Sequence, residues 1–253
     1  MINPIDWGTL KIAVCMSGIA RGNVGKHISL LKNAFPGADF YFATWNEHNN
    51  ELAQKYNSKT YPEPTLHYNP WMECITDCPH LKYKAYKKEF LGGQKLSTRT
   101  KLLHATKQII AHAYQLSDMP NYDIIVRTRW DTVVSEKVNF SKYVRQSFNE
   151  RKAIGFAIRG SRWTNLHQFK DIEHVYVSDP NDQTWSRDWM YWLNDNLIIH
   201  PMDIFDCENV HKLHQEKRLL PAEYGWYQVL SKNENHHCVY GGATIDRLSL
   251  IHI

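Results

Sequence analysis

The chain has 253 residues, of which 43% are hydrophobic and 22% are charged, and this composition excludes a long disordered or low-complexity polymer. A formal net charge of +4 and a sequence pI of about 8.7 permit an anionic ligand without requiring one. The 9 Trp and 14 Tyr residues suit a core, and they also suit surfaces that stack on sugars or bases.

The N-terminal stretch MINPIDWGTLKIAVCMSG contains an acidic residue and only a short apolar run, which is not the pattern of a signal peptide. No run of about 18 or more apolar residues occurs, so we expect no membrane span. Five cysteines, an odd number, favour a reducing compartment. We therefore expect a cytoplasmic protein, in the host cytoplasm if the chain is viral.

The first predicted elements alternate between strand and helix. Residues 10–18 (LKIAVCMSG) predict a buried strand, residues 23–35 show the apolar spacing of a helix that a Pro-Gly pair closes, and residues 38–45 predict a second strand. This β-loop-α-β order predicts a parallel strand pair with a right-handed crossover. Residues 56–96 form the least regular segment, which we expect to be a long loop with a role as a lid or acceptor-binding segment.

A helix capped by Ser97 is expected next, and its apolar stripe would consist of Leu102, Ala105, Ile109, Ala113 and Leu116. The expected elements that follow are strands at YDIIVRTRWD, at 153–158 and at 197–199, helices at 201–214 and within PAEYGWYQVLSKN, and a last strand near HHCVYGG. No repeat or linker is evident. We therefore predict a single domain spanning residues 1–253, of the α/β class, with a mixed, mostly parallel central sheet flanked by helices.

The loop after the first strand, SGIARGNVGK, is the first candidate site. Ser17, Gly18, Arg21 and Gly22 would lie at the carboxyl edge of the sheet, where α/β proteins usually bind ligands. Glycine lets backbone N–H groups approach phosphate oxygens, and Arg21 can add a bidentate contact. The loop matches neither G-x-G-x-x-G nor the P-loop pattern. Two interpretations stay open, a nucleotide-binding loop and a turn in which glycine only permits a tight connection.

The segment NYDIIVRTRWDTVVS delivers three charged side chains to the end of a buried strand. By strand alternation, Arg127, Arg129 and Asp131 share one face, and Thr128 and Trp130 lie on the other. Asp131 is a hard oxygen ligand for a divalent cation, and the two arginines suit phosphate oxygens. The alternative is a structural ion pair at the sheet edge. Three charges on one face favour the binding function.

Two carboxylates in the C-terminal half are candidate catalytic groups. Asp195 precedes an apolar segment and suits a general base, although it can equally cap a turn beside Asn194 and Asn196. Glu223, two residues after Pro221, is either a catalytic group or a carboxylate in the first turn of a helix.

Two weaker patterns occur between residues 74 and 90. The stretch CITDCPH contains Cys74, Cys78 and His80 without a second matching ligand pair, so zinc is not favoured. The stretch LKYKAYKKEF interleaves Lys and Tyr, as a nucleic-acid contact does. A solvated amphipathic helix is the favoured interpretation of that stretch.

Taken in order, IAVCMSGIARG, ADFYFATWNEH, YDIIVRTRWDTVV, NDNLIIHPMDIF and PAEYGWYQVL resemble a family of small GT-A-type glycosyltransferases of bacteria and viruses, including enzymes that decorate surface polysaccharide. The resemblance runs from about Lys11 to Leu230 and lies in order and spacing. It implies a GT-A-like, Rossmann-related fold and a nucleotide-diphosphate-sugar donor bound at the carboxyl edge of the sheet. On the family pattern, Ser17, Gly18 and Arg21 would contact the nucleotide.

The resemblance also implies a metal site. GT-A enzymes bind a divalent ion, Mn²⁺ or Mg²⁺, through an Asp-x-Asp motif, and the ion bridges the donor diphosphate. The matching positions here are Arg129, Trp130 and Asp131, so arginine replaces the first carboxylate. Two options follow: Asp131 binds a metal, or Arg129 neutralises the diphosphate itself, a role that suits its planar guanidinium.

We therefore hypothesise a glycosyltransferase that moves a sugar from a nucleotide-diphosphate sugar to a hydroxyl acceptor. On the family pattern Asp195 would lie near the acceptor, and it or Glu223 would deprotonate the acceptor if the enzyme inverts configuration. The acceptor is either a surface glycan or, in a phage setting, a hydroxymethylated base of double-stranded DNA that leaves the stack. Non-catalytic nucleotide-sugar binding and nucleic-acid binding remain the alternatives from other classes.

Overall fold

The computed structural model describes residues 10–66, 95–157, 175–177, 197–219, 222–230, 236–240 and 243–245. The described strands are β1 (Ile12–Ser17), β2 (Asp39–Trp45), β3 (Lys59–Tyr61), β4 (Ile124–Arg129), β5 (Thr132–Val134), β6 (Ala153–Ala157), β7 (Val175–Val177), β8 (Leu197–Pro201), β9 (His236–Tyr240) and β10 (Ala243–Ile245). The helices are α1 (Val24–Ala34), α2 (Glu51–Lys55), α5 (Lys95–Ser117), α6 (Phe140–Glu150), α7 (Cys207–Gln215) and α8 (Ala222–Leu230), with short 3-10 turns η1 (Asn46–His48) and η4 (Met202–Ile204).

The centre of the fold is one mixed sheet with the strand order β3-β2-β1-β4-β8-β6-β9-β7. Neighbouring strands β3, β2, β1 and β4 are all parallel, β8 is antiparallel to both β4 and β6, β9 is parallel to β6, and β7 is antiparallel to β9. Six of these eight described strands therefore point the same way. The predicted fold class, α/β with a mixed, mostly parallel sheet flanked by helices, is confirmed.

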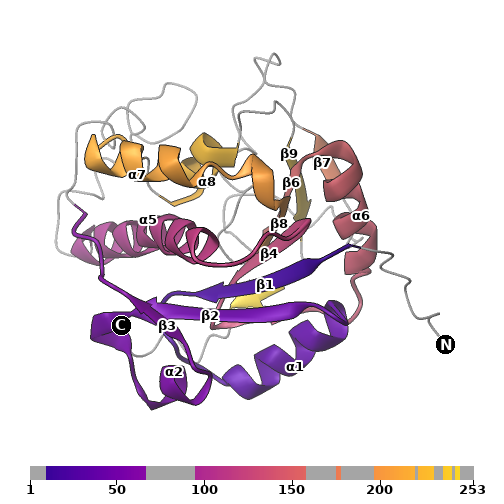
Figure 1. The fold of residues 1–253 in the computed structure, drawn as a ribbon, viewed down its shortest axis with the longest axis horizontal. Helices are drawn as coiled ribbons and strands as arrows, with labels where there is room; N and C mark the ends of the chain where they lie inside the picture. Colours follow the sequence, from indigo (N-terminus) through magenta and orange to yellow (C-terminus); the bar gives the residue numbers. More distant parts are fainter. Residues whose placement is uncertain are drawn as a thin grey trace.

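Helices cover both faces of the sheet. Figure 1 shows α5, α7 and α8 on one side of β1 and β2, with α1 on the other side. Helix α1 is positioned by its amphipathic pattern, because Val24, Ile28 and Leu31 lie one turn apart and are buried. The side chain of Asn23 caps its first turn by accepting a hydrogen bond from the backbone N–H of Lys26 at 3.3 Å.

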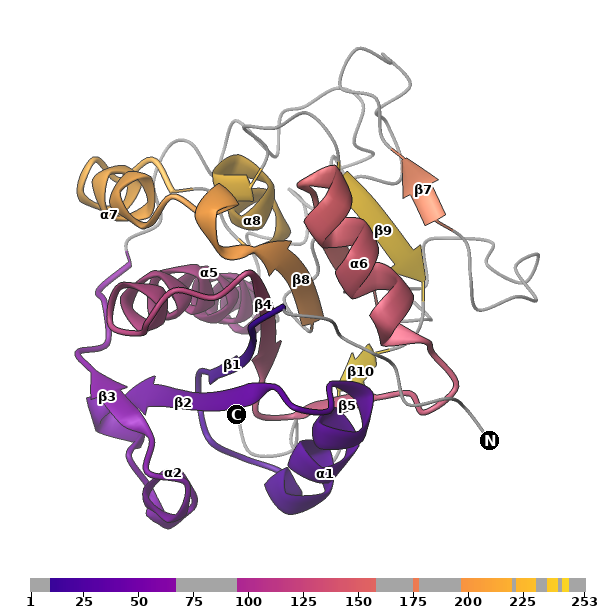
Figure 2. The same cartoon turned by 45° about the vertical axis from the view of Figure 1, so that its right-hand side comes forward.

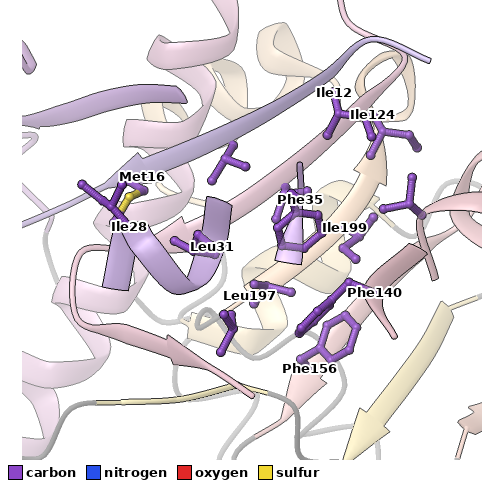
Figure 3. Packing of buried hydrophobic residues seen from close by; sticks show 14 of the residues in the cluster. Ile12, Met16, Ile28, Leu31, Phe35, Ile124, Phe140, Phe156, Leu197 and Ile199 are labelled. Atoms are coloured by element: carbon purple, nitrogen blue, oxygen red, sulfur yellow. The ribbon is translucent and has the colours of Figure 1, made fainter. Parts of the chain in front are cut away.

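Two apolar clusters result, one under each face of the sheet. Under α1 and α6, buried side chains from β1, β4, β6 and β8 meet the helices, and Figure 3 shows Phe35, Phe140 and Phe156 in this packing. The rings of Phe35 and Phe140 lie 5.1 Å apart between centroids. Burying one such ring stabilises the fold by roughly 2–3 kcal/mol. The second cluster joins Ala13, Cys15 and Ile125 of the sheet to α5, α7 and α8.

The structure corrects several expectations about individual elements. Helix α5 begins at Lys95, so Ser97 lies inside the helix and is not its N-cap. The predicted helix at 201–214 is η4 followed by α7, with the side chain of Asp206 capping α7 by accepting from the Asn209 N–H at 2.9 Å. Helices α2 and α6 and strands β3, β5, β7 and β10 were not expected. Figure 2 shows β5 beside β10, with which it pairs antiparallel in a separate two-stranded sheet.

Among the described helices, none combines the length and the apolar character that crossing a membrane requires.

Candidate functional site

The candidate site lies where β1 and β4 end. These two strands are adjacent and parallel, and the Cα of Ser17, the last residue of β1, is paired with that of Arg129, the last residue of β4. The loop after β1 and the turn after β4 therefore start side by side at the carboxyl edge of the sheet. In open α/β sheets ligands bind at this edge.

Three charged side chains from these two connections meet at one point. Asp131 accepts from Arg129, with Nε to Oδ1 at 2.8 Å and Nη2 to Oδ2 at 2.9 Å, so that contact is bidentate. Arg21 approaches from the loop after β1, with Nη2 at 2.8 Å and Nε at 3.0 Å from Oδ2 of Asp131. The Asp131 side chain is 2% exposed and each arginine side chain is 19% exposed. We call these three residues the edge cluster.

The electrostatics of the edge cluster favour ionised Asp131. Burial on its own would raise the pKa of this carboxyl group, but the charges of Arg129 and Arg21 and their hydrogen bonds outweigh it, so the pKa is lowered. Two guanidinium groups and one carboxylate leave the cluster with a formal charge of +1. The cluster therefore presents partly exposed positive charge at the sheet edge, which suits an anionic ligand.

The turn between β4 and β5 is anchored by Trp130. Its side chain is 1% exposed, and its indole Nε1–H donates to the carbonyl oxygen of Ala43 in β2 at 3.0 Å. Its own carbonyl oxygen accepts from Nδ1 of the buried His27 in α1, at 2.9 Å. Because β2 and α1 both hold the residue between Arg129 and Asp131, these two side chains project from a fixed turn.

Arg127 occupies different surroundings, although it lies only two residues before Arg129. Its side chain is fully buried between α5 and α8. Its Nη2 donates to Oε1 of Gln108 at 3.2 Å, and its guanidinium carbon lies 4.8 Å from the centre of a Trp226 ring. A guanidinium inside the protein is not presented to the sheet edge. We therefore expect Arg127 to support the site from within.

Gly18 and Ser17 line the boundary between that interior and the edge. Gly18 has φ of +109°, which L side chains rarely adopt, and an added Cβ would lie 2.6 Å from the amide end of Gln108. The backbone conformation therefore favours glycine here whether or not a ligand approaches it, and a Cβ would also require the amide end of Gln108 to move. The hydroxyl of Ser17 is 1% exposed and has no hydrogen-bond partner within the described part of the chain.

The prediction that Arg127, Arg129 and Asp131 share one strand face needs correction at Asp131 only, because the two arginines alternate normally within β4. Strand β4 ends at Arg129, and a turn rather than continued alternation carries the chain to Asp131. The structure therefore pairs Arg129 with Asp131 and Arg21, and it directs Arg127 into the interior. Trp130 does belong to the opposite apolar cluster, as the alternation predicts.

Sequence reasoning missed three residues that support this site, His27, Gln108 and Trp226. His27 lies on the buried face of α1 among apolar residues, which was a signal that its ring has an internal partner. Gln108 and Trp226 carried no comparable signal, because only the packing of α5 and α8 on the sheet brings them to Arg127.

Several predicted positions lie outside what the structure describes. Asp195 and the stretches CITDCPH and LKYKAYKKEF fall outside the described residues, as does most of the segment 56–96. Glu223 belongs to α8 by its backbone, but its side chain is outside the described set. The candidate catalytic and acceptor-binding groups therefore stay predictions.

The metal that the resemblance implies does not fit the described donors. A divalent ion of this kind takes several hard oxygen ligands, and Asp131 is already held by two guanidinium groups. No group of three or more His, Cys, Asp or Glu side chains suited to a metal occurs among the described residues.

No protein-family model matches the chain, and no curated protein matches it. Among solved structures, the mannose-1-phosphate geranyltransferase of Thermus thermophilus aligns over 95% of this chain and 77% of its own, at 10% identity and a TM-score of 0.41. A Bacillus anthracis protein assigned as a glucose-1-phosphate thymidylyltransferase aligns over 95% and 92%, at 11% identity and a TM-score of 0.43. The 1–349 fragment of S. aureus TarS aligns over 92% and 58%, at 13% identity and a TM-score of 0.37. These are distant likenesses, and they do not bear on the activity of this chain.

Proposed function

We propose that the chain is a glycosyltransferase that uses a nucleotide-diphosphate sugar and binds the donor diphosphate at the edge cluster. The observation that carries this proposal is the meeting of Arg21 and Arg129, from two neighbouring connections, at the carboxyl edge of parallel strands. Two planar guanidinium groups suit the oxygens of a diphosphate, because each carries five N–H donors and directs only those on Nε and Nη2 at Asp131. That the donor carries a sugar, and that this sugar is transferred, is inferred from the family resemblance found in the sequence.

In the proposed reaction, negative charge develops on the departing nucleoside diphosphate, next to the edge cluster. The acceptor hydroxyl oxygen forms a bond to the anomeric carbon, the bond from that carbon to the diphosphate oxygen breaks, and the electron pair leaves with the nucleoside diphosphate. Arg21 and Arg129 would stabilise the negative charge that builds on the departing group. In an inverting reaction the acceptor proton goes to a carboxylate, for which Asp195 is the first candidate and Glu223 the second.

A surface glycan is the acceptor that we propose, because it is the acceptor that the family resemblance implies. The stretch LKYKAYKKEF, on which a DNA acceptor was based, lies outside the described residues, and the edge cluster does not distinguish the two acceptors.

The test is a thermal-shift screen of the purified chain against a panel of nucleotide sugars. At a concentration of about 100 times the dissociation constant, a bound donor stabilises by about 2.7 kcal/mol, which raises the melting temperature by roughly 5 °C or more. Arg21→Ala and Arg129→Ala should each abolish the shift. Arg218→Ala, which removes an exposed arginine paired with Glu216, should leave it intact.

The same sample should then release nucleoside diphosphate when donor and a glycan acceptor are mixed. Donor binding without any release, with or without acceptor, would identify a non-catalytic nucleotide-sugar-binding protein instead. A chain that no nucleotide or nucleotide sugar stabilises would contradict the proposal altogether.

A further inference from the structure

Asp131 stands where the resemblance would place a metal ligand, and its contacts indicate a different role. We propose that Asp131 is the counter-ion that holds Arg21 and Arg129 together as an anion clamp, and that this clamp binds a nucleoside diphosphate without a divalent metal. The inference rests on the proposed function, because it concerns how the same site recognises the donor.

The two arginines use most of the acceptor capacity of Asp131. Four guanidinium nitrogens lie 2.8–3.0 Å from its carboxylate oxygens, one on Oδ1 and three on Oδ2. Each carboxylate oxygen offers about two lone-pair positions, so the arginines saturate Oδ2 and take one of the two positions on Oδ1. With a side chain that is only 2% exposed, Asp131 faces its arginines more than it faces solvent. A metal ion would have to displace a guanidinium group to reach Oδ2, and at Oδ1 it would lie directly beside the guanidinium of Arg129.

The charge around Asp131 also opposes a dication. Arg129 occupies the position at which the family motif has its first carboxylate, so one expected oxygen ligand is replaced by a permanent positive charge. Arg21 adds a second positive charge from the loop after β1. A divalent cation placed beside Asp131 would therefore meet two guanidinium groups at close range, whereas an anion there would meet attraction from both.

The carboxylate makes this pair of arginines possible. Two guanidinium groups that converge from separate connections repel each other, and a buried carboxylate between them offsets that repulsion while setting their orientation. The turn that bears Arg129 and Asp131 is itself fixed through Trp130, by the carbonyl of Ala43 and by His27. A clamp that is oriented before the ligand arrives loses little conformational freedom on binding, which favours affinity for a diphosphate.

The experiment is a calorimetric titration of the full chain with UDP, GDP, TDP and ADP. Each titration is done first in EDTA and then with Mn²⁺ or Mg²⁺ at about 1 mM, a concentration that would fill a weak metal site. We expect one of these nucleoside diphosphates to bind in EDTA, with a dissociation constant that either metal changes by less than about threefold. Arg21→Lys and Arg129→Lys should each weaken binding by about tenfold or more, since lysine keeps the charge but not the bidentate contact. Arg218→Lys, in an exposed ion pair, is the matched control and should bind normally.

Asp131→Asn decides the role of the carboxylate. On our inference it weakens binding in EDTA by about tenfold, because the arginines lose their charged anchor, and added metal does not restore the affinity. Thermal unfolding of the variant checks that the fold is retained. If Asp131→Asn does not fold, the two lysine variants still test the clamp, because they leave Asp131 and a positive charge in place.

Other outcomes separate this inference from the proposed function. Binding that requires Mn²⁺ or Mg²⁺ and disappears in Asp131→Asn would overturn the metal-free clamp and leave a glycosyltransferase with an ordinary metal site. Unchanged affinity of Asp131→Asn in EDTA would overturn the counter-ion role alone. The absence of binding by all four nucleoside diphosphates, with and without metal, would overturn both.

Discussion

Arg127 and Arg129 lie two residues apart on β4, yet they belong to regions with different physical chemistry. Arg129 is part of the edge cluster, where its side chain is 19% exposed and its partner is an ionised carboxylate. Arg127 is 0% exposed and belongs to what we call the interior cluster, which consists of Arg127, Gln108, Trp226, His112 and His200. A partly exposed guanidinium at the edge can reach a ligand oxygen, whereas one in the interior is fixed by packing. Residue type therefore does not reveal role here, and depth in the sheet does.

The interior cluster contains one pair of histidines, His112 on α5 and His200 on β8. Nδ1 of His200 donates to the Pro201 carbonyl oxygen at 2.8 Å, so its Nε2 in the neutral form accepts from Nε2 of His112 at 3.0 Å. Burial lowers the pKa of His200 to about 4, despite the opposing effect of the Pro201 carbonyl. Burial, the neighbouring His200 and the charge of Arg127 lower the pKa of His112 well below its usual value. Both rings are therefore neutral near pH 7.

The largest expected effect is a difference in stability between variants of Arg127 and of Arg129. Arg127→Ala should lower the free energy of unfolding by about 4 kcal/mol, because it opens a cavity and removes the partner of Gln108 and Trp226. Arg129→Ala should cost only about 1–2 kcal/mol, because Arg21 continues to neutralise Asp131. Urea unfolding of both variants measures the difference. Equal losses in the two variants would show that the interior and edge arginines do not differ as the structure indicates.

The second prediction concerns the pH dependence of the interior cluster. The folded-state pKa of His200 lies below its unfolded value of 6.5, so the unfolded chain binds the proton first and stability falls as the pH drops from 6.5 toward 4. The loss should reach roughly 3 kcal/mol over that window. Unfolding measured between pH 4 and 7 should show this slope in the natural chain, and the double variant His112→Gln/His200→Gln should flatten it. A slope that the double variant retains must come from other groups. Asp131 contributes only at lower pH, since its pKa is held below 3.8.

The third prediction tests the contact that joins the two regions. Gly18→Ala combines strain at φ of +109° with a Cβ placed 2.6 Å from Gln108, so it should cost about 2–3 kcal/mol of stability and displace Gln108 from Arg127. Gly37→Ala is the matched control, because Gly37 has φ of +79° but open space around its Cβ position. It should cost only about 1 kcal/mol, the backbone component. Thermal or urea unfolding compares the two, and similar costs would mean that Gln108 yields freely.

The smallest expected effect lies in the support of the edge turn. His27→Leu removes the hydrogen bond to the Trp130 carbonyl and should lower stability by about 1 kcal/mol. It should also weaken nucleoside-diphosphate binding by a few-fold. His27→Asn places an amide N–H near the position of Nδ1, and it should recover most of the binding. Calorimetric titration measures the dissociation constant of both variants. Equal dissociation constants for His27→Leu and the natural chain would show that His27 does not contribute to binding at the site.

The sequence alone was sufficient to predict most of the strands and helices that carry the two clusters. The apolar runs of β1, β2, β4 and β8 and the spacing of α1, α5 and α8 predicted those elements, because period-2 and period-3.6 burial are local properties of the chain. Helix α6 was missed although Phe140, Tyr143 and Val144 follow helical spacing. The short strands β3, β5 and β7 have three residues each, and their identity depends on the partner strand rather than on their own pattern.

The placement of charged residues at one sheet edge was also determined by the sequence, because the ends of parallel strands share an edge. Tertiary structure alone decided which charges meet. Arg21 reaches Asp131 because β1 and β4 are neighbours in register. The turn after Arg129 replaces the strand alternation that would have kept Asp131 on the same strand face as Arg127 and Arg129. Arg127 became an interior group because α5 and α8 close over it and bring Gln108 and Trp226 to its guanidinium. The sequence determines which residues are charged. Their solvent exposure and partners depend on contacts between segments about 20 to more than 100 residues apart, as for Arg127 with Gln108 and for Asp131 with Arg21.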